Sequence, residues 1–353
     1  MAGPEHLEQA IFNAVAGTED PLTRHERSSI LRRTAGLVAE KRDELAALIC
    51  RESGLCIRDA RYEMDRASDV LEFAAQETLR DDGQIFSCDV SPQGKSRKIF
   101  TFRQPVRLVA AITPFNHPLI QVVHKIAPAI AAGAPMILKP SEKTPLTALK
   151  FAELLYESGL PGWMLSVFVG PIDQVVTPMI TDPRVELVSF TGSVAVGKQI
   201  ARTAGYKKLC LELGGNSPLI ILDDADLDLA VHLAAEGAFR NSGQRCTAVK
   251  RILVQESILD AFTTKFVAKT ATYRAGDPED ENTIIGTVTT SLDSALRACK
   301  KLQAGTTNVN EVPGYRLEVT PFGGTKNSGL GIKEGVAEAA RFLTNTKTFS
   351  LPW

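Results

Sequence analysis

Between residues 106 and 222 the sequence alternates short apolar runs with segments of helical periodicity, and this alternation constrains the fold most. Strands that alternate with helices form a mostly parallel sheet covered by helices on both faces. The sequence therefore predicts an α/β fold whose ligands bind at the carboxyl ends of the strands. The predicted strands are 106–112, 136–138, 165–169, 186–190, 207–213 and 217–222, and the predicted helices are 117–132, 144–158, 172–180 and 194–203.

The flanking segments have other patterns. Apolar residues at helical spacing predict helices over 26–50 and 58–79, and a further helix over 226–240. Two strands joined like a hairpin are predicted at 98–102 and 106–112. Further strands are predicted at 249–254 and 342–351.

The composition narrows the classes of function. A chain of 353 residues is long enough for two domains, and its net charge of -1 gives no reason to expect nucleic acid or a membrane as partner. No apolar run is long enough to span a bilayer and no signal peptide is evident, so we expect a cytoplasmic protein. The six cysteines show no CxxC spacing and the five histidines are dispersed, so we expect reduced thiols and no metal site.

Cys246 follows Arg245 on the connection between the helix predicted at 226–240 and the strand predicted at 249–254. A cysteine on such a connection is typical of a nucleophile. The alternative is a small buried apolar residue, the usual role of a free cysteine. Glu212 ends a predicted strand and precedes two glycines, which makes it a candidate general base. The alternative for Glu212 is a charge at a strand end.

Two strand-to-helix loops contain further candidates. Asn116 lies between prolines and would direct its amide toward an oxyanion; the alternative is a helix-capping asparagine in a turn. Gly192 allows close backbone approach, and Ser193 with the free N–H groups of the following helix would form an anion site. Because this loop lacks the GxGxxG spacing, the alternative is an ordinary turn.

Taken together, these segments resemble the aldehyde dehydrogenase superfamily. The resemblance implies a Rossmann-type parallel-sheet cofactor domain (1–95 and 111–238), a truncated α/β catalytic domain (239–334) and a small β oligomerisation element (96–110 and 335–353). The matching segments are Thr113-Pro-Phe-Asn116, Lys139-Pro-Ser-Glu142, Phe190-Thr-Gly-Ser193, Glu212-Leu-Gly-Gly215, Gly243-Gln-Arg-Cys246, Thr307-Asn-Val-Asn310 and Pro321-Phe-Gly-Gly324 with Ser328-Gly-Leu-Gly331.

The resemblance also implies an activity, the NAD(P)-dependent oxidation of an aldehyde to a carboxylate through a cysteine thiohemiacetal and thioester. Cys246 would attack the carbonyl, with Arg245 expected to raise its thiolate fraction. The Asn116 amide and the Cys246 backbone N–H would hold the oxyanion, and Glu212 would activate the hydrolytic water.

The same resemblance implies a cofactor site. A carboxylate such as Glu142 beside the ribose suits a free 2′-hydroxyl, so NAD is expected and NADP is possible. The implied cofactor-binding residues are Ile112 and Thr113 on the nicotinamide side, Lys139, Ser141 and Glu142 near the adenosine ribose, and Gly192 and Ser193 at the pyrophosphate.

Within the superfamily the sequence is most similar to phosphonoacetaldehyde dehydrogenases, which implies a small anionic aldehyde as substrate. Arg245 and His117 would flank the substrate, and Arg66 would face the pocket entrance. The alternative for Arg66 is a solvated helix arginine. Nonphosphorylating glyceraldehyde-3-phosphate dehydrogenases also resemble the segment around Cys246, so activity of that kind is an alternative.

After Val288 the sequence departs from the family. A block on the order of a hundred residues is missing, and no Glu-x-Phe-Gly-Pro motif occurs, so exposed strand edges are expected. The chain is then a deletion product, a mis-assembled gene model or a natural paralogue. The alternative functions are a catalytically impaired nucleotide-binding or oligomer-modulating subunit, or a fragment that does not fold.

The resemblance also implies a homodimer or homotetramer. The strand at 342–351 would pair with the 98–110 region of a neighbouring subunit. The alternative is an edge strand that pairs within the same chain.

Overall fold

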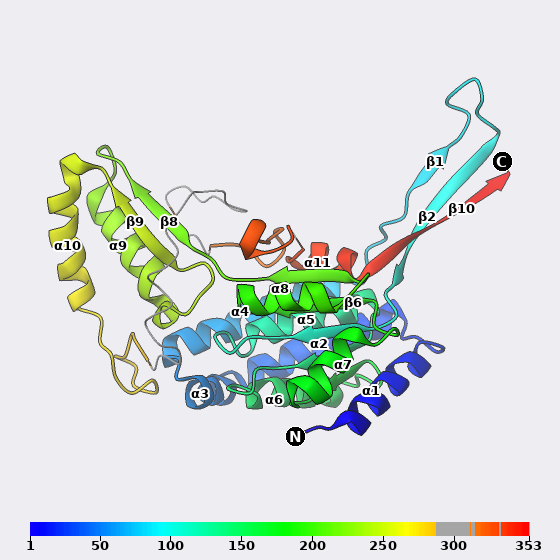
Figure 1. Ribbon diagram of the computed structural model, residues 1–353, viewed down its shortest axis with the longest axis horizontal. Coiled ribbons are helices and arrows are strands. Elements are labelled where there is room, and N and C mark those ends of the chain that lie inside the picture. The colour runs from blue at the N-terminus through cyan, green and yellow to red at the C-terminus, as the bar shows by residue number, and fades with distance from the viewer. Residues whose placement is uncertain (287–310, 312–314, 332, 353) are drawn as a thin grey trace.

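The structure is a computed structural model that describes residues 1–286, 311, 315–331 and 333–352 (Figure 1). Its centre is a five-stranded sheet in the order β5–β4–β3–β6–β7, in which every pair of neighbouring strands is parallel. This confirms the predicted α/β fold. The strands are β3 (Val109–Ile112), β4 (Met136–Lys139), β5 (Leu165–Val167), β6 (Leu187–Thr191) and β7 (Lys208–Glu212).

Helices cover both faces of this sheet. Successive residues of a strand point to opposite faces, so each buried strand contributes apolar side chains to both sides. In β3, Val109 and Ala111 join one apolar core, whereas Ala110 and Ile112 join the other. The first core contains residues of α2 (Arg24–Glu40), α3 (Arg42–Ser53), α4 (Ile57–Glu77), α5 (Ile120–Ala132), α6 (Leu146–Glu157) and α11 (Val336–Phe342). The second contains residues of α1 (Pro4–Gly17), of the π-helical turn Ile172–Val176, of α7 (Thr177–Thr181) and of α8 (Val194–Thr203).

The hairpin predicted for 98–102 and 106–112 is wrong. β2 (Arg97–Pro105) belongs to a three-stranded antiparallel sheet in the order β1–β2–β10, with β1 (Ile85–Ser87) and β10 (Thr344–Pro352). All four residues of β3 are buried, as expected for the middle of a parallel sheet, whereas no residue of β2 is fully buried. The two strands therefore belong to different sheets.

The predicted pairing of the C-terminal strand with a neighbouring subunit is also wrong. β10 pairs with β2 of the same chain, from Thr344 opposite Pro105 to Pro352 opposite Arg97. The rings of Phe100 and Phe349 stack across this pair with their centroids 5.1 Å apart. The three strands form an arm that projects from the body (Figure 1). Association of the chain into a homodimer or homotetramer through this element stays a prediction.

A smaller unit lies at the left of Figure 1. β8 (Ser217–Ile221) and β9 (Val249–Val254) form a parallel pair, with α9 (Leu227–Phe239) and α10 (Leu259–Ala271) packed against one face. β8 does not continue the five-stranded sheet, because the chain turns away after β7 at two glycines. In the described part of this unit Ile220, Leu222 and Leu253 are exposed. The predicted domain boundaries stay predictions.

Within the described residues, no helix combines the length and apolarity that a bilayer crossing requires. Among the same residues, no group of three or more His, Cys, Asp and Glu side chains is placed to hold a metal ion.

Candidate active site

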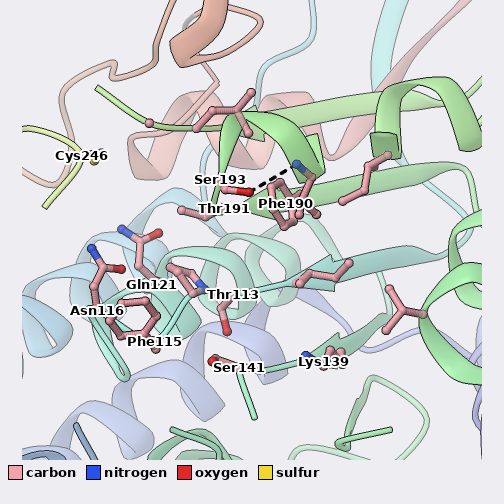
Figure 2. Close-up of a pocket in the computed structure, with 18 of the residues that line it drawn as sticks. Thr113, Phe115, Asn116, Gln121, Lys139, Ser141, Phe190, Thr191, Ser193 and Cys246 are labelled. Atoms are coloured by element: carbon pink, nitrogen blue, oxygen red, sulfur yellow. Dashed lines mark hydrogen bonds between the residues drawn. The ribbon is translucent and has the colours of Figure 1, made fainter. Parts of the chain in front are cut away.

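A cavity of about 580 Å³ follows the carboxyl ends of β3, β4, β6 and β7, as expected for a parallel sheet (Figure 2). Each of these strands ends in a loop that lines it. Thr113 follows β3, Ser141 follows β4, Ser193 follows β6 and Gly214 follows β7. Cys246 lines the cavity from the loop before β9.

The structure brings together every residue predicted to bind the cofactor. Lys139 is buried and forms an ion pair with the exposed Glu142. Although partial burial acts in the opposite direction, the hydrogen bond from Lys139 lowers the pKa of Glu142. The Glu142 carboxylate is therefore charged at neutral pH. The cavity is lined by Ile112, Thr113, Lys139, Ser141, Glu142, Gly192 and Ser193.

The loop after β6 leaves space for a ligand at the start of α8. Ser193 caps this helix, because its Oγ accepts the Val196 N–H at 3.3 Å. A Cβ at Gly192 would lie 2.5 Å from the Phe190 ring, so only glycine fits there without a shift. The free N–H groups of the first helical turn are suited to a phosphate group.

Hydrogen bonds join the loop that carries Cys246 to the loop that carries Asn116. Asn116 Nδ2 donates to the Gln244 carbonyl at 2.5 Å, and Asn241 Nδ2 donates to the Asn116 carbonyl at 3.0 Å. An amide NH₂ group has two donors, so Asn116 keeps one for another acceptor. Cys246 is exposed at the cavity. The Asn116–Gln244 bond was not predicted.

The turn before Cys246 has an uncommon backbone. Asn241, Ser242 and Gly243 have φ values of 58°, 53° and 71°. Left-handed conformations are costly for residues other than glycine, and they persist where surrounding contacts hold them. Cys246 therefore follows a backbone segment that its neighbours must keep in place.

As expected, the charge of Arg245 acts to lower the pKa of the Cys246 thiol, but desolvation and other groups outweigh it. Desolvation by the surrounding walls raises the pKa of the Cys246 thiol, and the charges of Glu212 and Glu334 add to this. Arg316 and Arg245 act in the opposite direction without outweighing it. Burial also lowers the pKa of Arg245, and the charge of Arg240 acts in the same direction.

Glu212 is buried at the end of β7, and its Oε1 has no hydrogen-bond partner among the described residues. Burial raises the pKa of Glu212 well above its ordinary value, and the charge of Glu334 adds to this. Lys125 and Arg316 act in the opposite direction. Glu212 is therefore protonated at neutral pH and must lose its proton to act as a base.

Lys125, Arg316 and Glu334 were not predicted. Lys125 is buried and its Nζ lies 2.9 Å from Ser189 Oγ, while Arg316 and Glu334 form an ion pair at 3.5 Å. The one available signal was Lys125, which with His124 interrupts the apolar segment 122–132. Nothing in the sequence connects Glu334 with Glu212, since they are far apart along the chain.

A second hollow adjoins the cavity, and His117, Gln121, Arg245 and Cys246 line both. Arg66 lines the hollow, not the cavity. The Arg66 side chain is 19% exposed and pairs with Glu318 at 2.5 Å, so it is not a solvated helix arginine.

Most basic side chains of the hollow have a carboxylate partner. The pairs, with their distances, are Arg66–Glu318 at 2.5 Å, His117–Glu63 at 2.7 Å, Arg240–Asp59 at 3.3 Å and Arg316–Glu334 at 3.5 Å. Arg245 differs, because its Nη2 donates to the Gly237 carbonyl at 3.2 Å and its buried Nε has no partner within the described chain. No carboxylate of the described residues pairs with Arg245, so it is the cation best placed to receive an anion.

We expect Gly215→Ala to displace Cys246. A Cβ at Gly215 would lie 1.9 Å from the Cys246 carbonyl oxygen, so one of the two backbones must move. Overpacking of this kind costs about 1–3 kcal/mol, which denaturant unfolding measures. The alkylation rate of Cys246, followed by peptide mass spectrometry, should change as well. Gly162→Ala is the control, since nothing lies within 4 Å of its Cβ position; equal results for both variants would contradict the prediction.

The parallel sheet, with a cavity along its carboxyl edge that reaches the start of α8, defines an α/β protein of the Rossmann type. The sequence matches the model of the aldehyde dehydrogenase family over residues 1–291 and 286–349. The chain therefore belongs to the aldehyde dehydrogenase family.

Two relatives show the extent of this similarity. The chain is 39% identical to 3-sulfolactaldehyde dehydrogenase of Priestia aryabhattai, over 81% of this chain and 60% of that protein. It is 36% identical to aspartate-semialdehyde dehydrogenase 1 of Pseudomonas canavaninivorans, over 92% of this chain and 67% of that protein. The chain thus spans about three fifths of the length of the curated relatives it matches.

Solved structures agree in fold. The structure of glyceraldehyde-3-phosphate dehydrogenase from Methanocaldococcus jannaschii, complexed with NADP, superposes with a TM-score of 0.89 at 29% identity, covering 100% of this chain and 95% of that one. The NAD-dependent aldehyde dehydrogenase of Sinorhizobium meliloti gives 0.89 at 26% identity, covering 99% and 88%. Neither comparison favours phosphonoacetaldehyde dehydrogenases over other members of the family.

Proposed function

We propose that the protein oxidises an anionic aldehyde to a carboxylate with NAD or NADP, through a covalent bond to Cys246. The observation that carries this proposal is the position of Cys246, exposed where the wide cavity meets the arginine-lined hollow. One ligand can approach the thiol from the sheet edge and another from the hollow. We propose that this reaction takes place in the cytoplasm.

The residues of the wide cavity fit a dinucleotide. The glycine at 192, the Ser193 cap and the free N–H groups of α8 suit its pyrophosphate. Lys139 and Glu142 would hold the adenosine ribose, and the Glu142 carboxylate favours NAD over NADP. Ile112 and Thr113 would line the nicotinamide side. When bound, the dinucleotide accepts the two electrons that the aldehyde carbon loses.

The chain's own residues supply the covalent chemistry. Cys246 Sγ attacks the carbonyl carbon as a thiolate, and the new oxyanion is held by the Cys246 backbone N–H and the free Asn116 amide hydrogen. After oxidation to the thioester, Glu212 takes a proton from water, which attacks the acyl carbon and releases the carboxylate. Both the thiol and Glu212 have a raised pKa, so both steps gain from higher pH.

The charge of the hollow supports an anionic substrate. Arg245 has no carboxylate partner in the described chain, and a guanidinium binds phosphonate, phosphate or carboxylate through paired hydrogen bonds. The names of relatives include sulfolactaldehyde, whose sulfonate makes it an anion at neutral pH, and aspartate semialdehyde, which carries a carboxylate beside its ammonium group. We propose a phosphonate-bearing aldehyde such as phosphonoacetaldehyde, bound by Arg245, His117 and Arg66, with glyceraldehyde 3-phosphate as the alternative.

Replacing Arg245 by leucine should raise KM for phosphonoacetaldehyde by on the order of tenfold to a hundredfold, because a charge-assisted hydrogen bond is lost. KM for uncharged propionaldehyde should change little. Arg202→Leu, which removes an exposed arginine on α8, is the control. Steady-state kinetics with both aldehydes measures the difference. Equal increases for the two substrates would rule out Arg245 as the anion-binding residue.

A second candidate is a nucleotide-binding subunit without turnover. It is favoured by the extent of the match, which covers 60% of the relative from Priestia, and by the two-stranded sheet that the described residues form beside Cys246. We propose that a block of the catalytic domain is missing after Val288. Aldehyde-dependent NADH formation by the wild-type chain decides between the candidates. NAD binding without NADH formation, in cooperatively folded protein, would favour the second.

A further inference from the structure

Helix α4 carries two buried carboxylates that have no role in the mechanism above. Asp59 and Glu63 are 4% and 2% exposed. They are four residues apart, so they project from the same face of the helix, one turn from each other. Each binds one of the two loops that carry the reacting groups.

Glu63 holds the segment that follows Asn116. Its Oε2 accepts the N–H groups of Leu119 and Ile120 at 3.1 and 3.2 Å, where α5 begins. Its Oε1 lies 2.7 Å from His117 Nδ1. The Glu63 carboxylate thus fixes both the backbone at the start of α5 and the His117 imidazole, which lines the cavity and the hollow.

Asp59 holds the turn that precedes Cys246. Its Oδ2 accepts the Asn241 N–H at 2.8 Å, and its Oδ1 lies 3.3 Å from Arg240 Nε. The Arg240 guanidinium is also placed over the Tyr62 ring, 3.8 Å from its centroid. Asn241 is the first of the three residues with left-handed backbone, so Asp59 bonds to the start of this uncommon turn.

Helix α4 is rigid enough to relate the two loops. It runs through 21 residues, and Ala60, Met64 and Ala67 on it are buried in the core. From this arrangement we propose that Asp59 and Glu63 are positioning residues. Together they fix the distance between the Cys246 thiol and the Asn116 amide. The Asn116–Gln244 and Asn241–Asn116 hydrogen bonds join the same two loops directly and help to keep this distance. The inference rests on the proposed function, since it assigns these residues to the formation of the Cys246 adduct.

The test compares Asp59→Ala and Glu63→Ala with the conservative variants Asp59→Asn and Glu63→Gln. Asp65→Ala is the matched control, because Asp65 lies on the same helix and, among the described residues, forms only an exposed pair with Arg42 at 2.8 Å. The first readout is the burst rate of Cys246 acylation by p-nitrophenyl acetate. The second is hydrogen exchange in the peptides that span 240–246 and 117–121, and the third is the melting temperature.

We expect both alanine variants to acylate ~100-fold more slowly, the loss associated with a displacement of about 1 Å. The asparagine and glutamine variants keep one acceptor oxygen and should recover part of the rate. Exchange should rise only in 240–246 for Asp59→Ala and only in 117–121 for Glu63→Ala.

An acylation rate no lower than that of Asp65→Ala would overturn the inference. So would rates that follow the melting temperature equally in the alanine and conservative variants, which is the behaviour of residues with a structural role alone. A wild-type chain that folds and is not acylated would overturn the proposed function, and with it this inference; that outcome is recognised because no variant is needed to see it.

Discussion

Cys246→Ala is expected to lower aldehyde-dependent NADH formation by on the order of 10⁴-fold or more, since loss of a nucleophile removes the covalent route altogether. Cys246 is exposed and lines both the cavity and the hollow, and alanine leaves a methyl group that cannot attack a carbonyl. The residues assigned to the dinucleotide are left unaltered, so dinucleotide binding should be unchanged. Initial rates of NADH formation and NAD titration by fluorescence measure the two properties.

Cys88→Ala is the matched control for this substitution. Cys88 is half-buried next to β1 on the projecting arm, and its backbone N–H bonds to the Arg97 carbonyl. Its loss should leave the rate within twofold of wild type, about the scatter expected for a surface change. Turnover by Cys246→Ala at a comparable rate would show that another group performs the reaction.

Glu212→Gln is expected to separate the two halves of the reaction. The acylation burst with p-nitrophenyl acetate should remain, while steady-state hydrolysis falls by about 10²–10⁴-fold, the usual contribution of a general base. Glutamine has nearly the same shape but cannot take a proton from water. Stopped-flow measurement of the burst and of the steady state gives both rates. Loss of the burst together with the steady state would contradict this assignment.

The pH dependence follows from the raised pKa of Glu212. A base must be deprotonated, and burial with the nearby Glu334 charge favours its protonated form, so hydrolysis should rise with pH from neutral into the alkaline range. In Glu334→Gln one of these two causes is removed, and the rise should move to lower pH. A rise that stays in place, or moves to higher pH, would show that Glu334 does not act on Glu212.

The strand-and-loop order of the cofactor cavity could be predicted because each loop follows its own strand. Thr113, Ser141 and Ser193 reach one edge simply because parallel strands end at the same edge. The separation of β2 from β3 could not be predicted in this way. Both segments have the strand-like composition, and only the packing of helices on both faces of β3 decides between them.

The buried charges were less predictable. Asp59 and Glu63 look like the polar face of an amphipathic helix, because the loops that bury them are far away in the sequence. The same holds for Glu334, whose effect on Glu212 arises only when the C-terminal segment folds over β7. The net raised pKa of Cys246 depends on these distant carboxylates and on the cavity walls, so the neighbouring Arg245 alone suggested the opposite.

The cavity and the hollow meet at four shared residues, His117, Gln121, Arg245 and Cys246. This arrangement affects how ligands enter and leave the site. The thiol is accessible from two sides, so a molecule seated on one side does not close the other. Under the proposed function, entry and exit can follow separate routes, with a carboxylate product departing past the arginines while the ligand at the sheet edge stays in place. An inhibitor shaped for the arginine side is then expected to compete with the aldehyde alone and to leave exchange of the nucleotide unchanged.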